Sequence, residues 1–124
     1  MYPSKEHTPP VYSKGGYMEQ HATALGSKYD GKKSRYDLIP PYPLEQLARI
    51  YTFGAQKYSD RNWEKGMKWG RIFAAMMRHA WAFWRGEDKD SETGIHHLAS
   101  VAFCAFALME YGRTHKELDD RGKA

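Results

Sequence analysis

The stretch LASVAFCAFALM, residues Leu98–Met109, decides the fold of this chain. It is almost wholly apolar, and its length and alanine content favour a helix over a strand. The whole helix is expected to run from about Gly94 to Tyr111. A helix that is apolar on every side has to be covered on every side. Three helices of a small domain cover it only in part, so we expect a homo-oligomer, a dimer or a tetramer, with this helix in the interface.

Two further helices are expected before this one. The first should begin near Pro43, a favourable first-turn residue, and end near Ser59. The second should run from about Arg71 to Arg85. The predicted fold class is therefore all-α, a bundle of three main helices with an irregular N-terminal arm, completed by oligomerisation. In the first helix the apolar residues repeat at helical spacing, namely Leu44, Leu47, Ala48, Tyr51, Ala55 and Tyr58.

Composition divides the chain into three parts. Residues 1–32 are rich in Pro, Gly, Ser, Tyr and Lys and show no sustained period, which is typical of a flexible or extended arm. Residues 33–113 form the predicted helical domain, and residues 114–124 form a charged C-terminal tail. The lead-in from Lys32 to Pro43 is expected to be an entry strand or irregular.

Charge and cysteine content limit the partners of the chain. Its 124 residues suggest a single domain, and a formal charge of +4 favours anionic partners such as nucleotides, nucleic acid or other phosphates. Cys104 is the one cysteine, which excludes a disulfide framework and fits a reducing cytoplasm. We find no apolar run that would span a membrane, so a cytoplasmic protein is expected.

Residues that bind metals or phosphates gather in GEDKDSETGIHH, Gly86–His97, and in the preceding Arg78-His79. Carboxylate oxygens suit a hard divalent cation, and histidine suits metal ligation or acid–base work. The alternatives are a solvated polar loop and a pair of structural histidines, one of which caps the following helix. The candidate carboxylates are Glu87, Asp88, Asp90 and Glu92, and the candidate histidines are His79, His96 and His97.

Basic and aromatic residues provide candidates for substrate binding. Arg71, Arg78 and Arg85 repeat every seven residues and so form one stripe on the second helix. With Lys57, Arg61 and Lys68 this stripe could bind a triphosphate, or it could be an ordinary solvated face. In the loop before it, Asn62 could pair with a purine edge and Trp63 could stack on the base. Alternatively, Trp63 covers the edge of the core and Asn62 makes a turn.

Taken in order, these segments resemble a known family. The runs RYDLIPPYPLEQLARIYTFGAQKY, RNWEKG and RHAWAFWRGEDKDSETGIHHLASVAF resemble the small phage-type dATP/dGTP diphosphohydrolases, MazG-like members of the all-α nucleotide pyrophosphohydrolase group. The resemblance covers about Lys33–Tyr111. It implies Mg²⁺- or Mn²⁺-dependent cleavage between the α- and β-phosphates of a purine deoxynucleoside triphosphate, with dGTP first and dATP second, in phage nucleotide metabolism. The products would be the monophosphate and pyrophosphate.

The acids of this chain depart from the pattern of that group. MazG-like enzymes usually carry ExxE on one helix and ExxD on the next, whereas Glu87 and Asp90 form an ExxD in the predicted loop. Either the helix boundary differs, or histidines and loop acids replace the usual ligands. The expected metal ligands are Glu87, Asp90, Glu92, His79 and His97. The expected catalytic residues are His79, Glu87 and His97, and the expected substrate-binding residues are Lys57, Asn62, Trp63, Arg71 and Arg78.

Two other classes of function compete with hydrolysis. A basic accessory protein could bind single-stranded nucleic acid through its Tyr- and Lys-bearing arm and the arginine stripe, without catalysis. Such binding would depend on salt and need no metal. Asp90→Ala should then spare binding, whereas it should abolish hydrolysis. A purely structural helical subunit would leave the cluster of acids and histidines without a use.

Overall fold

The computed structural model describes residues 25–122, and the chain divides between Ile39 and Pro40 into two units. In the first unit the described residues form a turn at 31–33 and a short 3-10 helix, η2, Tyr36–Leu38. The lead-in before the first helix is thus irregular and contains no strand. The arm predicted for residues 1–32 falls mostly on residues 1–24, outside the described part of the chain.

The second unit contains three α-helices, α3, Pro41–Lys57, α4, Trp69–Trp84, and α5, His97–Thr114. Residues 25–122 contain no named strand, so the all-α prediction is confirmed. The third helix begins later than predicted because the segment before it folds back on itself, with Gly94 at a φ of 73°. It also ends later than predicted, at Thr114 rather than near Tyr111. No helix within the described range is long and apolar enough to span a membrane.

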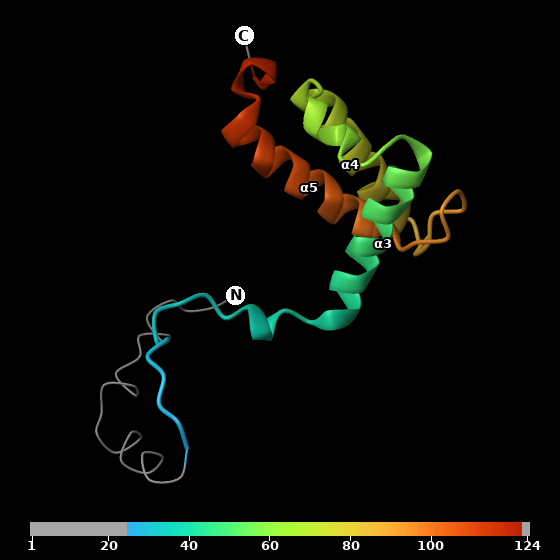
Figure 1. Ribbon diagram of the computed structural model, residues 1–124. Coiled ribbons are helices and arrows are strands. Elements are labelled where there is room, and N and C mark those ends of the chain that lie inside the picture. The colour runs from blue at the N-terminus through green and yellow to red at the C-terminus, as the bar shows by residue number, and fades with distance from the viewer. Residues whose placement is uncertain (1–24, 123–124) are drawn as a thin grey trace. The chain divides into compact units, whose positions relative to one another are not determined.

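Helix α5 is the centre of this unit. It lies alongside α4 as an antiparallel pair, and α3 packs against its N-terminal part (Figure 1). Tyr111, near the end of α5, is completely buried. The main core lies between α4 and α5, and its buried members are Trp69, Ile72, Cys104, Ala107 and Tyr111. A second cluster joins α3 to α5 through Ile50, Ile95 and Ala99.

Buried hydrogen bonds hold the loop between α3 and α4 against the end of α5. This loop contains a 3-10 helix, η3, Asn62–Lys65. The hydroxyl of Tyr111 donates to the carbonyl oxygen of Trp63 at 2.6 Å, and the indole of Trp69 donates to the carbonyl of His115 at 3.1 Å. Residues of the predicted tail form η4, Lys116–Leu118, which packs on the same core.

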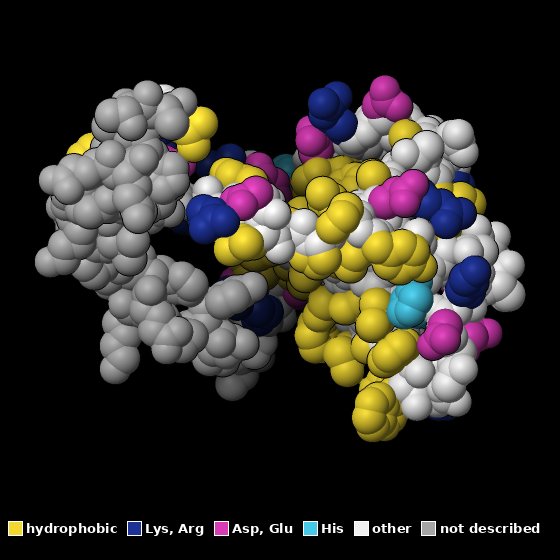
Figure 2. Space-filling view, turned by 90° about the horizontal axis from the view of Figure 1, so that it is seen from below, with side chains coloured by type: hydrophobic (Ala, Val, Ile, Leu, Met, Phe, Trp, Pro, Cys, Tyr) yellow, Lys and Arg dark blue, Asp and Glu magenta, His cyan; other side chains and the backbone are white. Residues whose placement is uncertain are grey.

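One surface of the α4–α5 pair remains apolar and exposed. Leu98, Phe106 and Met109 of α5 are 40%, 47% and 66% exposed. Figure 2 shows hydrophobic side chains gathered on one face of the molecule. The described residues therefore do not cover α5 on all sides. Helix α4 adds three further exposed aromatic residues, Phe73, Trp81 and Trp84.

Gly66 is the position at which this packing requires glycine. Its φ is +99°, and a Cβ there would lie 2.9 Å from Cδ1 of Leu118 and 3.0 Å from the ring of His115. We predict that Gly66→Ala lowers the free energy of unfolding by about 1–3 kcal/mol, measured by chemical denaturation. Gly112→Ala is the matched control, because a Cβ at Gly112 meets nothing within 4 Å and the position is helical. It should stabilise the protein by about 0.5–1 kcal/mol. Equal effects of the two variants would contradict the prediction.

Candidate functional site

The segment between α4 and α5 folds back as a compact loop. The backbone N–H of Asp90 donates to the carbonyl of Ile95 at 2.9 Å, and that of Gly94 donates to Asp90 at 2.7 Å. The N–H of His97 donates to the carbonyl of Asp88 at 2.7 Å. Ile95 is 4% exposed and packs in the cluster that joins α3 to α5. The loop therefore turns its carboxylates back toward the helices.

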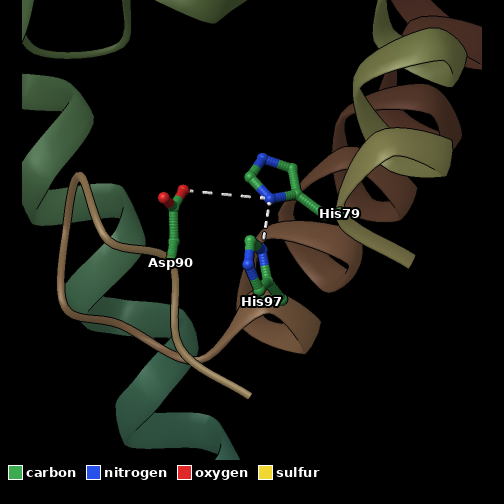
Figure 3. A group of neighbouring side chains, drawn as sticks. All are labelled: His79, Asp90 and His97. Carbon is green, nitrogen blue, oxygen red and sulfur yellow. Dashed lines mark hydrogen bonds and ion pairs between the residues drawn. The ribbon is translucent and has the colours of Figure 1, made fainter. Parts of the chain in front are cut away.

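This fold brings two histidines and one carboxylate together (Figure 3). Nδ1 of His79, on α4, lies 2.9 Å from Nδ1 of His97, on the first turn of α5. The same atom of His79 lies 3.9 Å from Oδ2 of Asp90. One ligand atom from each residue lies within 4.8 Å of the others. Two imidazole nitrogens and one carboxylate are a donor set suited to a divalent metal ion.

Glu87 and His96 lie beside this cluster, and each makes a specific hydrogen bond. Nε2 of His97 lies 2.9 Å from Oε1 of Glu87, so Glu87 contacts His97 at the ring nitrogen that does not face His79. Nδ1 of His96 accepts from the backbone N–H of Leu98 and caps α5, which is the structural role considered for one histidine. Burial lowers the pKa of His79, with His97 acting in the same direction and Asp90 against it. The lowered pKa favours the neutral form of the His79 imidazole.

A cavity of about 540 Å³ opens beside this cluster. Its wall includes His79 and Asp90, and elsewhere it is lined by aromatic rings and by polar groups of the α3–α4 loop. Gly54 lies on this wall, and a Cβ at that position would meet nothing within 4 Å. The absent side chain thus leaves room in the cavity rather than serving helix packing. The aromatic residues of the lining are Tyr51, Phe53, Tyr58, Trp63 and Phe103.

Two cations reach the same cavity. Nζ of Lys57, at the end of α3, lies 2.9 Å from Oε2 of Glu92 on the folded-back loop. This hydrogen bond and the charge of Glu92 raise the pKa of Lys57. Arg61 also lines the cavity, from a left-handed backbone conformation with φ of 58°. The cavity therefore combines metal-ligand chemistry, positive charge and aromatic surface.

The structure places the predicted residues in three groups. His79, Asp90 and His97 come together, and Glu87 contacts the group from behind His97. The cavity wall includes Lys57, Asn62, Trp63 and Glu92. The remaining two, Arg71 and Arg78, are exposed on α4 and do not line the cavity.

Several lining residues were not among the predicted site residues. Tyr51 fitted the apolar pattern of its helix and so was assigned to the core alone. Phe103 and Ser100 lie within or beside the apolar run of α5 and carried no signal of their own. Tyr51 packs edge-on against Phe103, with ring centroids 4.9 Å apart. Only the crossing of α3 over α5 makes these residues one surface.

Comparison with known proteins gives a family and a relative. A family model described as dATP/dGTP diphosphohydrolase, N-terminal, matches residues 23–121. A protein of Salmonella phage PMBT28, named dATP/dGTP diphosphohydrolase, is 40% identical over 77 residues. These residues make up 62% of this chain and 26% of that protein, so the chain spans about a quarter of the relative's length. No solved structure matches the chain significantly.

Proposed function

Because the chain belongs to the dATP/dGTP diphosphohydrolase N-terminal family, we propose that it hydrolyses a purine deoxynucleoside triphosphate to the monophosphate and pyrophosphate. We assign dGTP as the first substrate and dATP as the second, in phage nucleotide metabolism in the host cytoplasm. The observation that carries the proposal is the convergence of His79, Asp90 and His97 at the edge of a cavity lined by cations and aromatic rings.

The cavity suits a nucleotide in size and in the distribution of its groups. Its volume of about 540 Å³ lies within the range of about 300–1,000 Å³ that is usual for small-molecule sites. The triphosphate would lie near the cluster, where Lys57 and Arg61 neutralise its charge. The base would stack among the aromatic residues, and the Asn62 amide can pair with a purine edge. Lys57 is then shared between Glu92 and the substrate.

The cluster fits a divalent ion, and we propose that hydrolysis needs Mg²⁺ or Mn²⁺. The lowered pKa of His79 favours the neutral form that a metal ligand needs, and His97 is held by Glu87 with Nδ1 toward the cluster. His79, Asp90 and His97 would hold the ion, and an ion with three protein ligands would still be able to bind water or substrate. When bound, such an ion would polarise a phosphoryl oxygen and make an attacking water more acidic. Glu87 serves to orient His97, because it does not line the cavity.

We also propose that the protein is a homo-oligomer, a dimer or a tetramer, with α5 in the interface. The support is the apolar surface that the described residues leave uncovered on α4 and α5. Exposed apolar patches of this kind are typical of protein interfaces.

The proposed activity is tested by incubating the protein with each dNTP and NTP and either Mg²⁺ or Mn²⁺. Purine dNTPs should give monophosphate and pyrophosphate, measured by chromatography. Asp90→Asn should lower kcat by more than about 100-fold, because losing a metal ligand reduces activity more than losing a residue that only contacts a ligand. Asp88→Asn, on the same loop but with an exposed side chain outside the cavity, should retain activity.

Intact nucleotides in every reaction would overturn the proposal, and release of tripolyphosphate would move the protein to the triphosphohydrolases. Salt-dependent binding of single-stranded nucleic acid that Asp90→Ala spares, without hydrolysis, would establish the accessory protein instead.

The cavity itself is tested at Gly54. We predict that Gly54→Leu raises KM for the nucleotide at least about tenfold, because a Cβ there meets nothing within 4 Å and the larger side chain would take up space in the cavity. The melting temperature should not fall. Thr52→Leu introduces the same side chain on a part of α3 that does not line the cavity, and should leave KM unchanged. An unchanged KM in Gly54→Leu would place the substrate elsewhere.

The oligomer is tested by light scattering during size-exclusion chromatography. The native protein should elute with a mass that is a multiple of the monomer, and the double substitution Phe106→Glu and Met109→Glu should give monomers. Thr52→Glu adds charge to an exposed polar position of α3 and should leave the mass unchanged. A monomeric native protein would contradict the assignment of α5 to an interface.

A further inference from the structure

We propose that the resident ion on His79, Asp90 and His97 is a nitrogen-preferring first-row transition ion, and that Mg²⁺ is not the ion bound there. Its use in catalysis rests on the proposed hydrolysis, whereas its binding does not. Under this assignment Zn²⁺ and Co²⁺ bind more tightly than Mn²⁺, and Mn²⁺ binds more tightly than Mg²⁺. Any Mg²⁺ that takes part enters with the phosphates of the substrate.

The contact between the two histidines needs either a shared proton or a cation between their Nδ1 atoms. Their Nδ1 atoms are 2.9 Å apart, so their lone pairs cannot face each other unless a proton or a cation lies between them. Two ligand atoms at about 2.1 Å from one ion lie about 3 Å apart at right angles and about 3.4 Å apart at the tetrahedral angle. The observed separation is therefore close to that of two neighbouring ligands of one ion, and a shift of about 0.5 Å reaches the tetrahedral value.

The neighbouring groups prepare the ligand atoms for this arrangement. Glu87 accepts from Nε2–H of His97, which leaves the Nδ1 lone pair directed at the cluster. Oδ1 of Asp90 accepts from the backbone N–H of Glu92 at 2.9 Å, and Oδ2 is the oxygen nearest His79. His97 is 5% exposed, so its ring has little freedom to turn away. The ligand atoms of His97 and Asp90 are therefore each oriented by a second contact.

The donor types decide the class of ion. Imidazole nitrogen suits zinc, iron, nickel and copper, whereas Mg²⁺ prefers oxygen ligands and keeps several waters. Two of the three protein ligands here are imidazoles. The other acids nearby do not supply further oxygen ligands, since Glu87 contacts His97 and Glu92 pairs with Lys57. Within the described residues, this is the group of side chains found close enough to hold a metal.

A substitution at His79 can change the preference of the site between Zn²⁺ and Mg²⁺. Nδ1 of histidine and Oδ1 of aspartate are both bonded to Cγ, so aspartate presents an oxygen in nearly the same place. His79 is part-exposed, and replacing it does not disturb the buried contact between His97 and Glu87. His79→Asp therefore changes one ligand from nitrogen to oxygen, and His79→Asn gives the matched neutral oxygen.

Titration calorimetry of the metal-free protein with each ion alone tests the assignment. Zn²⁺ and Mn²⁺ should both bind more tightly than Mg²⁺, and His79→Asp should narrow the difference in affinity between Zn²⁺ and Mg²⁺ relative to the native protein. Bound Mn²⁺ should show nitrogen coupling in pulsed electron paramagnetic resonance, and His79→Asp should weaken it. Glu87→Ala should lower Mn²⁺ affinity by about 10–100-fold, whereas Asp88→Asn should not.

Tighter binding of Mg²⁺ than of Mn²⁺ by the native protein, or bound Mn²⁺ without nitrogen coupling, would overturn the assignment. Equal losses of affinity in Glu87→Ala and Asp88→Asn would also count against it, because they would reflect loop charge alone. Circular dichroism confirms that each variant is folded. These binding measurements contain no nucleotide, so they remain valid even if the protein hydrolyses no nucleotide. If the protein hydrolyses nucleotides but binds Mg²⁺ more tightly than Mn²⁺, the assignment of the ion fails and the proposed hydrolysis stands.

Discussion

The burial of Ile95 between α3 and α5 is the interaction on which the site depends. Ile95 lies in the loop that follows α4, and its side chain is packed against Ile50 and Ala99. That apolar contact holds the loop in its folded-back form, from which Asp90 faces His79. A polar loop on its own has no reason to choose this conformation over many others. The arrangement of the cluster therefore depends on the packing of Ile95 together with the backbone hydrogen bonds of the loop.

A second set of contacts fixes the opposite wall of the cavity. The fully buried Tyr111 holds the carbonyl of Trp63, and Gly66 allows the chain to approach His115 and Leu118. Asn62 and Trp63 are thus positioned from the far end of α5, while His97 stands at its beginning. Helix α5 thus connects the two ends of the site, and its buried apolar residues pack against α4 and α3.

The helices could be predicted from sequence because apolar spacing and length encode them locally. The residues of the site were recognisable by type, since few folds place acids, histidines and arginines so densely without use. Their arrangement was not predictable, because it depends on a loop conformation set by a distant apolar contact. Arg71 and Arg78 show the same limit: their spacing indicates one stripe, but only the packing of α4 shows that the stripe lies outside the cavity.

His79, Asp90 and His97 all belong to one hairpin, residues 79–97, rather than to segments scattered along the chain. Closing so short a segment costs little chain entropy, and its contacts are local, which favours early formation during folding. The relative positions of these three side chains are therefore set within one short segment, whereas the cavity beside them also needs α3 and the loop that follows it.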